Sequence, residues 1–183
     1  GMIGAAALFA EPRPVVINPA WPRLTNLLLR GTPIGPDGYP QLCGAITAKH
    51  MPELELLDLA KTGMGDIGAR LVFNAVRELK KLRGLDLDGN PFGAEGLKPL
   101  EWKAPSRNRV VVVGLGTLSM RDMSEAMDRA AWQSLGRAIM GGCFPSIKQL
   151  FASNEGTTAV GRVLACEPAQ LAVNAVMARR KAD

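Results

Sequence analysis

The sequence predicts an α/β solenoid built from about five stacked units of strand, turn and helix. Two observations carry this prediction. Leucines recur in sets with one internal spacing, and the sets that begin at Leu24, Leu54 and Leu82 lie 30 and then 28 residues apart. Behind each set, a turn residue and two glycines recur at matching distances. Self-similarity with a period of about 30 residues is typical of repeat proteins, whose units bury their apolar faces against their neighbours.

Each aligned column in the first three units has a physical interpretation. The first three columns are apolar and bury one face of a short strand. The Thr or Asn that follows can hydrogen-bond backbone groups where the strand ends. The next apolar residue fills the corner between strand and helix, and the glycines fit a tight turn and let the helix approach the strand. The columns are Leu24/Leu54/Leu82, Leu27/Leu57/Leu85, Leu29/Leu59/Leu87, Thr32/Thr62/Asn90, Ile34/Met64/Phe92, Gly35/Gly65/Gly93, Gly38/Gly68/Gly96 and Leu42/Val72/Leu100.

The first units also define the N-terminal boundary of the repeats. Residues 1–22 are expected to cap the first unit, because their prolines exclude a long helix and residues 15–17 suit a short edge strand. The clearest helix is expected in the second unit, over Asp66–Lys81. Its apolar face comprises Ile67, Leu71, Ala75, Val76 and Leu79.

Beyond Leu100 the pattern loosens. The fourth strand is placed on Val110, Val113 and Leu115, which lie 28 residues after the third set. This register turns three other residues toward the opposite face of the sheet. They are Val112, Gly114 and Gly116.

A longer helix is expected over about residues 124–140, ended by the glycines at 141 and 142. The fifth strand is placed on Ile147, Leu150 and Ala152. A final amphipathic stretch suits a capping helix. We therefore expect a single domain over residues 1–183, with a cap at 1–22, repeats at 23–165 and a capping helix at 166–183.

Composition excludes several classes of protein. The net charge is +5, yet aromatic residues are not interleaved with basic ones, so nucleic-acid binding is not expected. Three cysteines far apart argue against a disulfide scaffold or a zinc site and favour an intracellular, cytoplasmic setting. No apolar run is long enough to span a membrane. One histidine excludes any site that needs two, and neither a cofactor nor a metal is expected.

These columns resemble leucine-rich repeats of the ribonuclease-inhibitor type, strongly over residues 24–100 and more loosely over 110–165. The resemblance implies a short right-handed horseshoe arc, with parallel strands on the concave side and helices on the convex side. It also implies a non-catalytic module that binds a protein partner through the concave face. Proteins with such repeats include nuclease inhibitors, activators of a small GTPase, actin-capping proteins and immune sensors.

The expected strand phase turns acidic side chains toward the concave face. Asp58, Asp86 and Asp88 are expected to cluster on adjacent strands, which lie about 5 Å apart. Like charges that close cost free energy unless something offsets them, so we expect a basic segment of a partner protein to dock there. The other candidate partner-binding residues are Arg30, Asn26, Gln149 and Phe151.

The same residues allow other interpretations. The acidic residues also suit a solvated patch or, less well, a divalent cation site, while Leu28 and Phe151 suit coverage by terminal caps. Gly114 and Gly116 hint at a nucleotide-binding turn, but Ser119 occupies the place of its third glycine. For the whole chain, the alternatives to an interaction module are a regulator of an enzyme partner, GTPase-activator-like or nuclease-inhibitor-like, and a structural subunit of a larger assembly.

Overall fold

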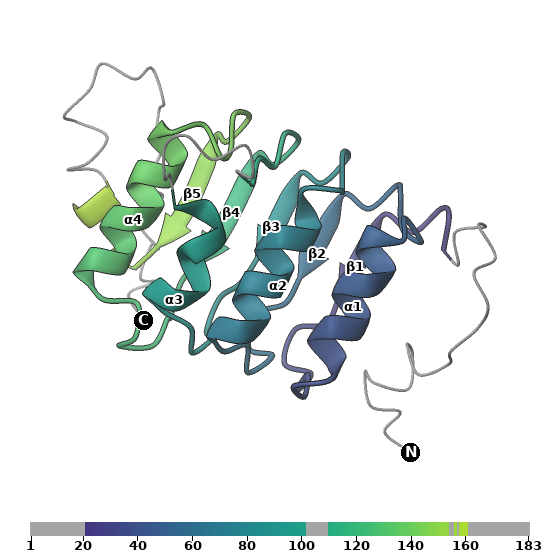
Figure 1. The fold of residues 1–183 in the computed structure, drawn as a ribbon, viewed down its shortest axis with the longest axis horizontal. Coiled ribbons are helices and arrows are strands. Elements are labelled where there is room, and N and C mark those ends of the chain that lie inside the picture. The colour runs from purple at the N-terminus through teal and green to yellow at the C-terminus, as the bar shows by residue number, and fades with distance from the viewer. Residues whose placement is uncertain (1–20, 102–109, 154–155, 157, 161–183) are drawn as a thin grey trace, which may run out of the picture.

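The computed structural model describes residues 21–101, 110–153, 156 and 158–160 of the chain (Figure 1). These residues form one parallel sheet of five strands in the order β1-β2-β3-β4-β5. Its elements follow one another as strand and helix along the chain. They are β1 (Asn26–Leu28), α1 (Gly38–Thr47), β2 (Leu56–Asp58), α2 (Asp66–Val76), β3 (Gly84–Asp86), α3 (Ala94–Leu97), the 3-10 helix η2 (Lys98–Leu100), β4 (Thr117–Met120), α4 (Arg129–Met140) and β5 (Gln149–Ala152).

The recurring apolar sets form the core because the strands pair in register. Leu27 pairs with Leu57, and Leu57 with Leu85, so equivalent leucines stack across the sheet. Leu57 and Leu85 are at most 1% exposed. Helices α1 to α4 cover the same face of the sheet, and each packs against the next along the chain (Figure 1). The expected α/β leucine-rich-repeat solenoid, with strands on the concave side and helices on the convex side, is therefore confirmed.

The second glycine column keeps each helix close to the corner of its own unit. A Cβ atom on Gly38 would lie 2.7 Å from Ile34, and one on Gly68 would lie 3.0 Å from Met64. At Gly96, the added atom would lie 2.9 Å from the Cβ of Ala69 in the preceding helix. The second glycine column therefore lets each helix pack closely against its corner residue or the preceding helix, while the expected approach of helix and strand stays a prediction.

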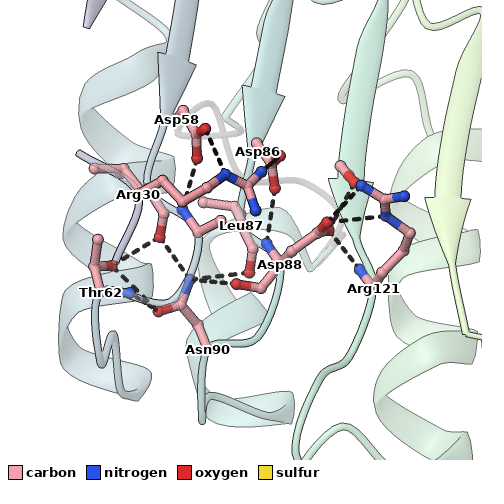
Figure 2. Close-up of polar contacts among 11 residues, drawn as sticks. Arg30, Asp58, Thr62, Asp86, Leu87, Asp88, Asn90 and Arg121 are labelled. Carbon is pink, nitrogen blue, oxygen red and sulfur yellow. Dashed lines mark hydrogen bonds and ion pairs between the residues drawn. The ribbon is translucent and has the colours of Figure 1, made fainter. Parts of the chain in front are cut away.

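A buried asparagine joins the turns of the second and third units. Asn90 is fully buried, and its Nδ2 donates to the carbonyls of Leu59 and Leu87 at 2.8 and 2.9 Å (Figure 2). Its Oδ1 accepts from the backbone N–H groups of Thr62 and Met64 at 3.1 and 2.9 Å. The role expected of this column in the turn is thus confirmed for Asn90, whose side chain also joins one unit to the other.

The prediction for the fourth strand is wrong. Strand β4 begins at Thr117, and its inward residue Leu118 pairs with Leu85. The set that fits the repeat is therefore Leu115, Leu118 and Met120, all of which are fully buried. The residues placed outward by the earlier register do not lie on this strand. Val112 is buried instead, and its N–H donates to the carbonyl of Cys143 at 2.8 Å.

Smaller differences concern helix ends and faces. Helix α2 ends at Val76 rather than at Lys81, and Ile67 is 69% exposed instead of lying on the buried face. Helix α4 begins at Arg129, because the Asp128 side chain caps it by accepting from the Ala131 N–H at 2.8 Å. Residues 1–20 and 166–183 lie outside the described part of the chain, so both terminal caps remain predictions.

Candidate functional site

The strand side chains that point away from the helices form the concave face of the sheet. Each strand contributes two positions to this face, one of them a glycine on β3, and the parallel register aligns these positions in two rows across the five strands. The first row is Asn26, Leu56, Gly84, Thr117 and Gln149. The second row is Leu28, Asp58, Asp86, Ser119 and Phe151.

Asp58 and Asp86 hold one guanidinium between them. Each carboxylate uses Oδ1 to accept a backbone N–H two residues further along the chain, just beyond the end of its strand, at Ala60 and Asp88, both at 3.0 Å. This bond fixes the carboxylate and directs Oδ2 across the face. Arg30, which follows β1, donates from Nε to Asp58 at 3.0 Å and from Nη2 to Asp86 (Figure 2).

Asp88 lies deeper and is paired with a different arginine. Its Oδ1 accepts from the Ser119 hydroxyl at 2.6 Å and from the Arg121 backbone N–H at 2.7 Å. Its Oδ2 accepts from Nε of Arg121 at 2.9 Å, while Nη2 of the same arginine lies 2.8 Å away (Figure 2). The Arg121 guanidinium also lies 5.6 Å from the ring centre of Phe151, within the range of a cation–π contact.

Burial and charge act in opposite directions on this network. Burial raises the pKa of Asp86, and the neighbouring carboxylates of Asp88 and Asp58 raise it further. The N–H of Asp88 and the guanidinium of Arg30 lower the same pKa, but burial is the largest effect and the net shift of the pKa is upward. The pKa of Arg30 is itself raised, chiefly by its hydrogen bond to Asp58. Arg30 is therefore a permanent cation of this face.

The structure brings Asp58, Asp86 and Asp88 together, as the strand phase indicates, and also supplies their counter-charges. Arg30 and Arg121 offset the repulsion that led us to expect a basic partner segment. The Asp88 side chain is only 5% exposed, because it lies two residues beyond the end of β3 and is bonded to Ser119 and Arg121 of the next unit. The Asp88 carboxylate is therefore out of direct reach of a partner.

The remaining predicted residues lie near the two ends of the face. Asn26 is exposed on β1, beside an apolar residue, Leu28, that is 62% exposed. Gln149 is exposed on β5 and accepts from the Thr117 hydroxyl at 3.3 Å. Phe151 is half-buried against Arg121.

Sequence reasoning missed Ser119 and Arg121, both of which contact Asp88. The cause is the fourth-strand register, which put a different segment on the sheet. A usable signal exists in the sequence. Leu115, Leu118 and Met120 repeat the spacing of the third set, five residues after the set that was chosen.

Two further properties concern membranes and metals. No helix in the described part of the chain is long and apolar enough to cross a membrane. Among the same residues, no group of three His, Cys, Asp or Glu side chains is arranged to hold a metal ion.

Comparison with known proteins identifies likeness at the level of the fold. No protein-family model matches the chain, and no curated protein matches its sequence. A solved tropomodulin C-terminal domain from Caenorhabditis elegans is similar with a TM-score of 0.57 and 20% identity, over 78% of this chain and 83% of that one. A structure described as Leiomodin-1 Actin-Binding Site 2 gives a TM-score of 0.62 at 14% identity, over 84% and 90%.

These neighbours correct the resemblance drawn from the sequence. The chain is not assigned to the ribonuclease-inhibitor type, because the similar solved structures are a tropomodulin domain and a leiomodin domain. At 20% identity or less, the likeness establishes the fold that they share, a leucine-rich-repeat solenoid.

Proposed function

We propose that this chain is a non-catalytic interaction module that binds a protein partner through the concave face of its sheet. The observation that carries the proposal is the fixed network formed by Arg30, Asp58, Asp86, Asp88 and Arg121. It sets charged groups in place before any partner arrives, so little side-chain entropy remains to be lost on binding.

The same face also offers an apolar anchor. Leu28 and Leu56 are exposed on adjacent strands, and Leu56 leans over Gly84, where an added Cβ would lie 2.8 Å from its side chain. Interfaces combine such apolar contacts with surrounding polar groups. A strand face of this kind suits a partner protein better than a small molecule, because the groups are spread over five strands.

Actin is the first partner to test, because one structure with this fold is described as an actin-binding site. The experiment immobilises the chain and measures capture of purified actin, as monomers and as filaments, and of proteins from a cell extract. The wild type is compared with Leu28→Ser on the concave face and Ile67→Ser on helix α2. These two residues are 62% and 69% exposed, so the pair is matched in chemistry and differs in position.

Capture that survives Ile67→Ser and is lost with Leu28→Ser supports binding through the concave face. If every captured protein, actin included, binds both variants equally, the concave face is not the binding surface and the proposal fails.

A further inference from the structure

We infer that the partner of the concave face is an acidic protein segment that carries an apolar side chain and docks on Arg30 and Leu28. This inference rests on the proposed function and assigns a chemistry to its partner. It differs from the basic segment expected from the sequence, and the reason lies in which charged atoms reach the surface.

The cations of the face are exposed and the anions are recessed. The side chains of Arg30 and Arg121 are 46% and 45% exposed, whereas those of Asp58, Asp86 and Asp88 are 14%, 18% and 5% exposed. A partner that approaches the sheet therefore meets guanidinium groups first.

Hydrogen-bonding capacity points the same way. Both oxygens of Asp58 and of Asp86 already accept bonds from within the chain. A guanidinium has five N–H donors, and the described contacts of Arg30 use only its Nε and one Nη2 atom. A carboxylate oxygen can accept a second bond, but the remaining acceptor sites belong to side chains that are only 14% and 18% exposed, whereas the remaining N–H groups belong to Arg30, which is 46% exposed. The capacity within reach of a partner is therefore mainly that of a donor, which suits carboxylates and backbone carbonyls.

Long-range attraction favours the same partner. The whole chain carries a net charge of +5, so an acidic protein is drawn toward it before contact. At short range, a basic segment would have to displace Arg30 from Asp58 and Asp86.

An apolar group beside the charge fixes the position of the segment. Arg30 lies two residues beyond Leu28, the last residue of β1, and the pairing with the next unit continues past it, because the N–H groups of Leu29 and Gly31 donate to the carbonyls of Asp58 and Ala60. Leu56 is the diagonal neighbour of Leu28 on β2. Residues two apart along a strand are separated by about 7 Å, which is also the spacing of alternate side chains in an extended partner. A segment with an acidic and an apolar residue at alternate positions therefore matches both groups.

The test uses two short, fluorescently labelled peptides, one of alternating glutamate and leucine and the other of alternating lysine and leucine. Binding to the full chain is measured by fluorescence anisotropy at neutral pH. We expect the acidic peptide to bind more tightly than the basic one, and its affinity to fall as the salt concentration is raised. Leu28→Ser and Arg30→Gln should each weaken it by about tenfold, whereas the convex-side controls Ile67→Ser and Arg137→Gln should leave it within about twofold.

Thermal unfolding establishes whether each variant is folded. If Arg30→Gln is unfolded, the effect of Leu28→Ser on peptide binding decides whether the inference holds. The inference is overturned if the basic peptide binds as tightly as the acidic one, or if Leu28→Ser weakens binding no more than Ile67→Ser. If the basic peptide binds more tightly and its binding is lost with Leu28→Ser, the partner is not acidic, but docking on this face is supported. If neither peptide binding nor protein capture responds to the concave variants, the proposed function fails as well.

Discussion

The Oδ1 atom of Asn90 accepts a hydrogen bond from the backbone N–H of Thr62, 28 residues earlier, at 3.1 Å. This contact joins the end of one strand to the turn of the preceding unit. It is one of several hydrogen bonds by which the buried Asn90 amide satisfies backbone N–H and carbonyl groups of two units. Buried backbone groups need such partners within the protein.

Removing the Asn90 side chain should therefore cost more than an exposed substitution. We expect Asn90→Ala to lower the free energy of unfolding by about 2 to 4 kcal/mol, because buried carbonyl and N–H groups lose their partners. Urea denaturation measures the change. The control is Asn74→Ala, at an exposed position of α2, where the lost amide donates to the Arg70 carbonyl, and it should cost less than about 0.5 kcal/mol. Equal effects of the two substitutions would contradict the role given to Asn90.

The two glycines at the starts of α2 and α3 should respond differently to alanine. A Cβ atom on Gly93 would lie 2.2 Å from the carbonyl oxygen of Ala126, whereas one on Gly65 meets nothing within 4 Å. Both residues have negative φ, so the difference is steric. We expect Gly93→Ala to lose about 2 kcal/mol or more and Gly65→Ala to change stability by only a few tenths. Thermal unfolding of both variants measures this, and comparable losses would show that the contact at Ala126 can relax.

A lysine occupies a left-handed position at the end of helix α1. Lys49 has a φ of 59°, and its N–H and that of His50 donate to Ile46 and Ala45. Gly142, with a φ of 78°, makes the equivalent bonds after α4. We expect Lys49→Gly to raise the free energy of unfolding by about 1 kcal/mol, and Gly142→Ala to lower it by a similar amount. Chemical denaturation would refute this if Lys49→Gly were destabilising.

The raised pKa of Asp86 predicts a direction for pH dependence. The folded protein binds this proton more tightly than the unfolded chain does. The stability that Asp86 contributes is therefore full below the ordinary pKa of an aspartate and is lost as pH rises through the raised folded pKa. Asp86→Asn removes the titration. The free energy of unfolding of the wild type, relative to this variant, should thus increase on acidification. The opposite trend would mean that the ion pair with Arg30 outweighs burial.

The fold was predictable because its signal is repeated. Leu27, Leu57 and Leu85 each mark the inward position of a short strand, and they pair with one another across the sheet, so each unit supports the same register. Prediction failed where two apolar sets competed. Val110, Val113 and Leu115 share the spacing of the true set, and only packing against β3 selects Leu118 as the inward residue.

The candidate site was less predictable because it depends on side-chain direction beyond the strands. The pattern indicates that Asp58 and Asp86 lie side by side, and they do. It does not indicate that Arg30 reaches across two strands, or that Asp88 turns inward to meet Arg121. Those contacts arise from rotamers and from the chain turns after each strand, neither of which follows from a two-residue period.

The most direct test of binding through the concave face compares protein binding by the matched variants Leu28→Ser and Ile67→Ser, with actin as the first partner and the two peptides as probes. We predict that the concave-face variant loses binding about tenfold and that the helix-face variant does not. Equal binding by the two variants, for every protein and peptide that the wild type captures, would contradict the claim that this sheet face is the interaction surface.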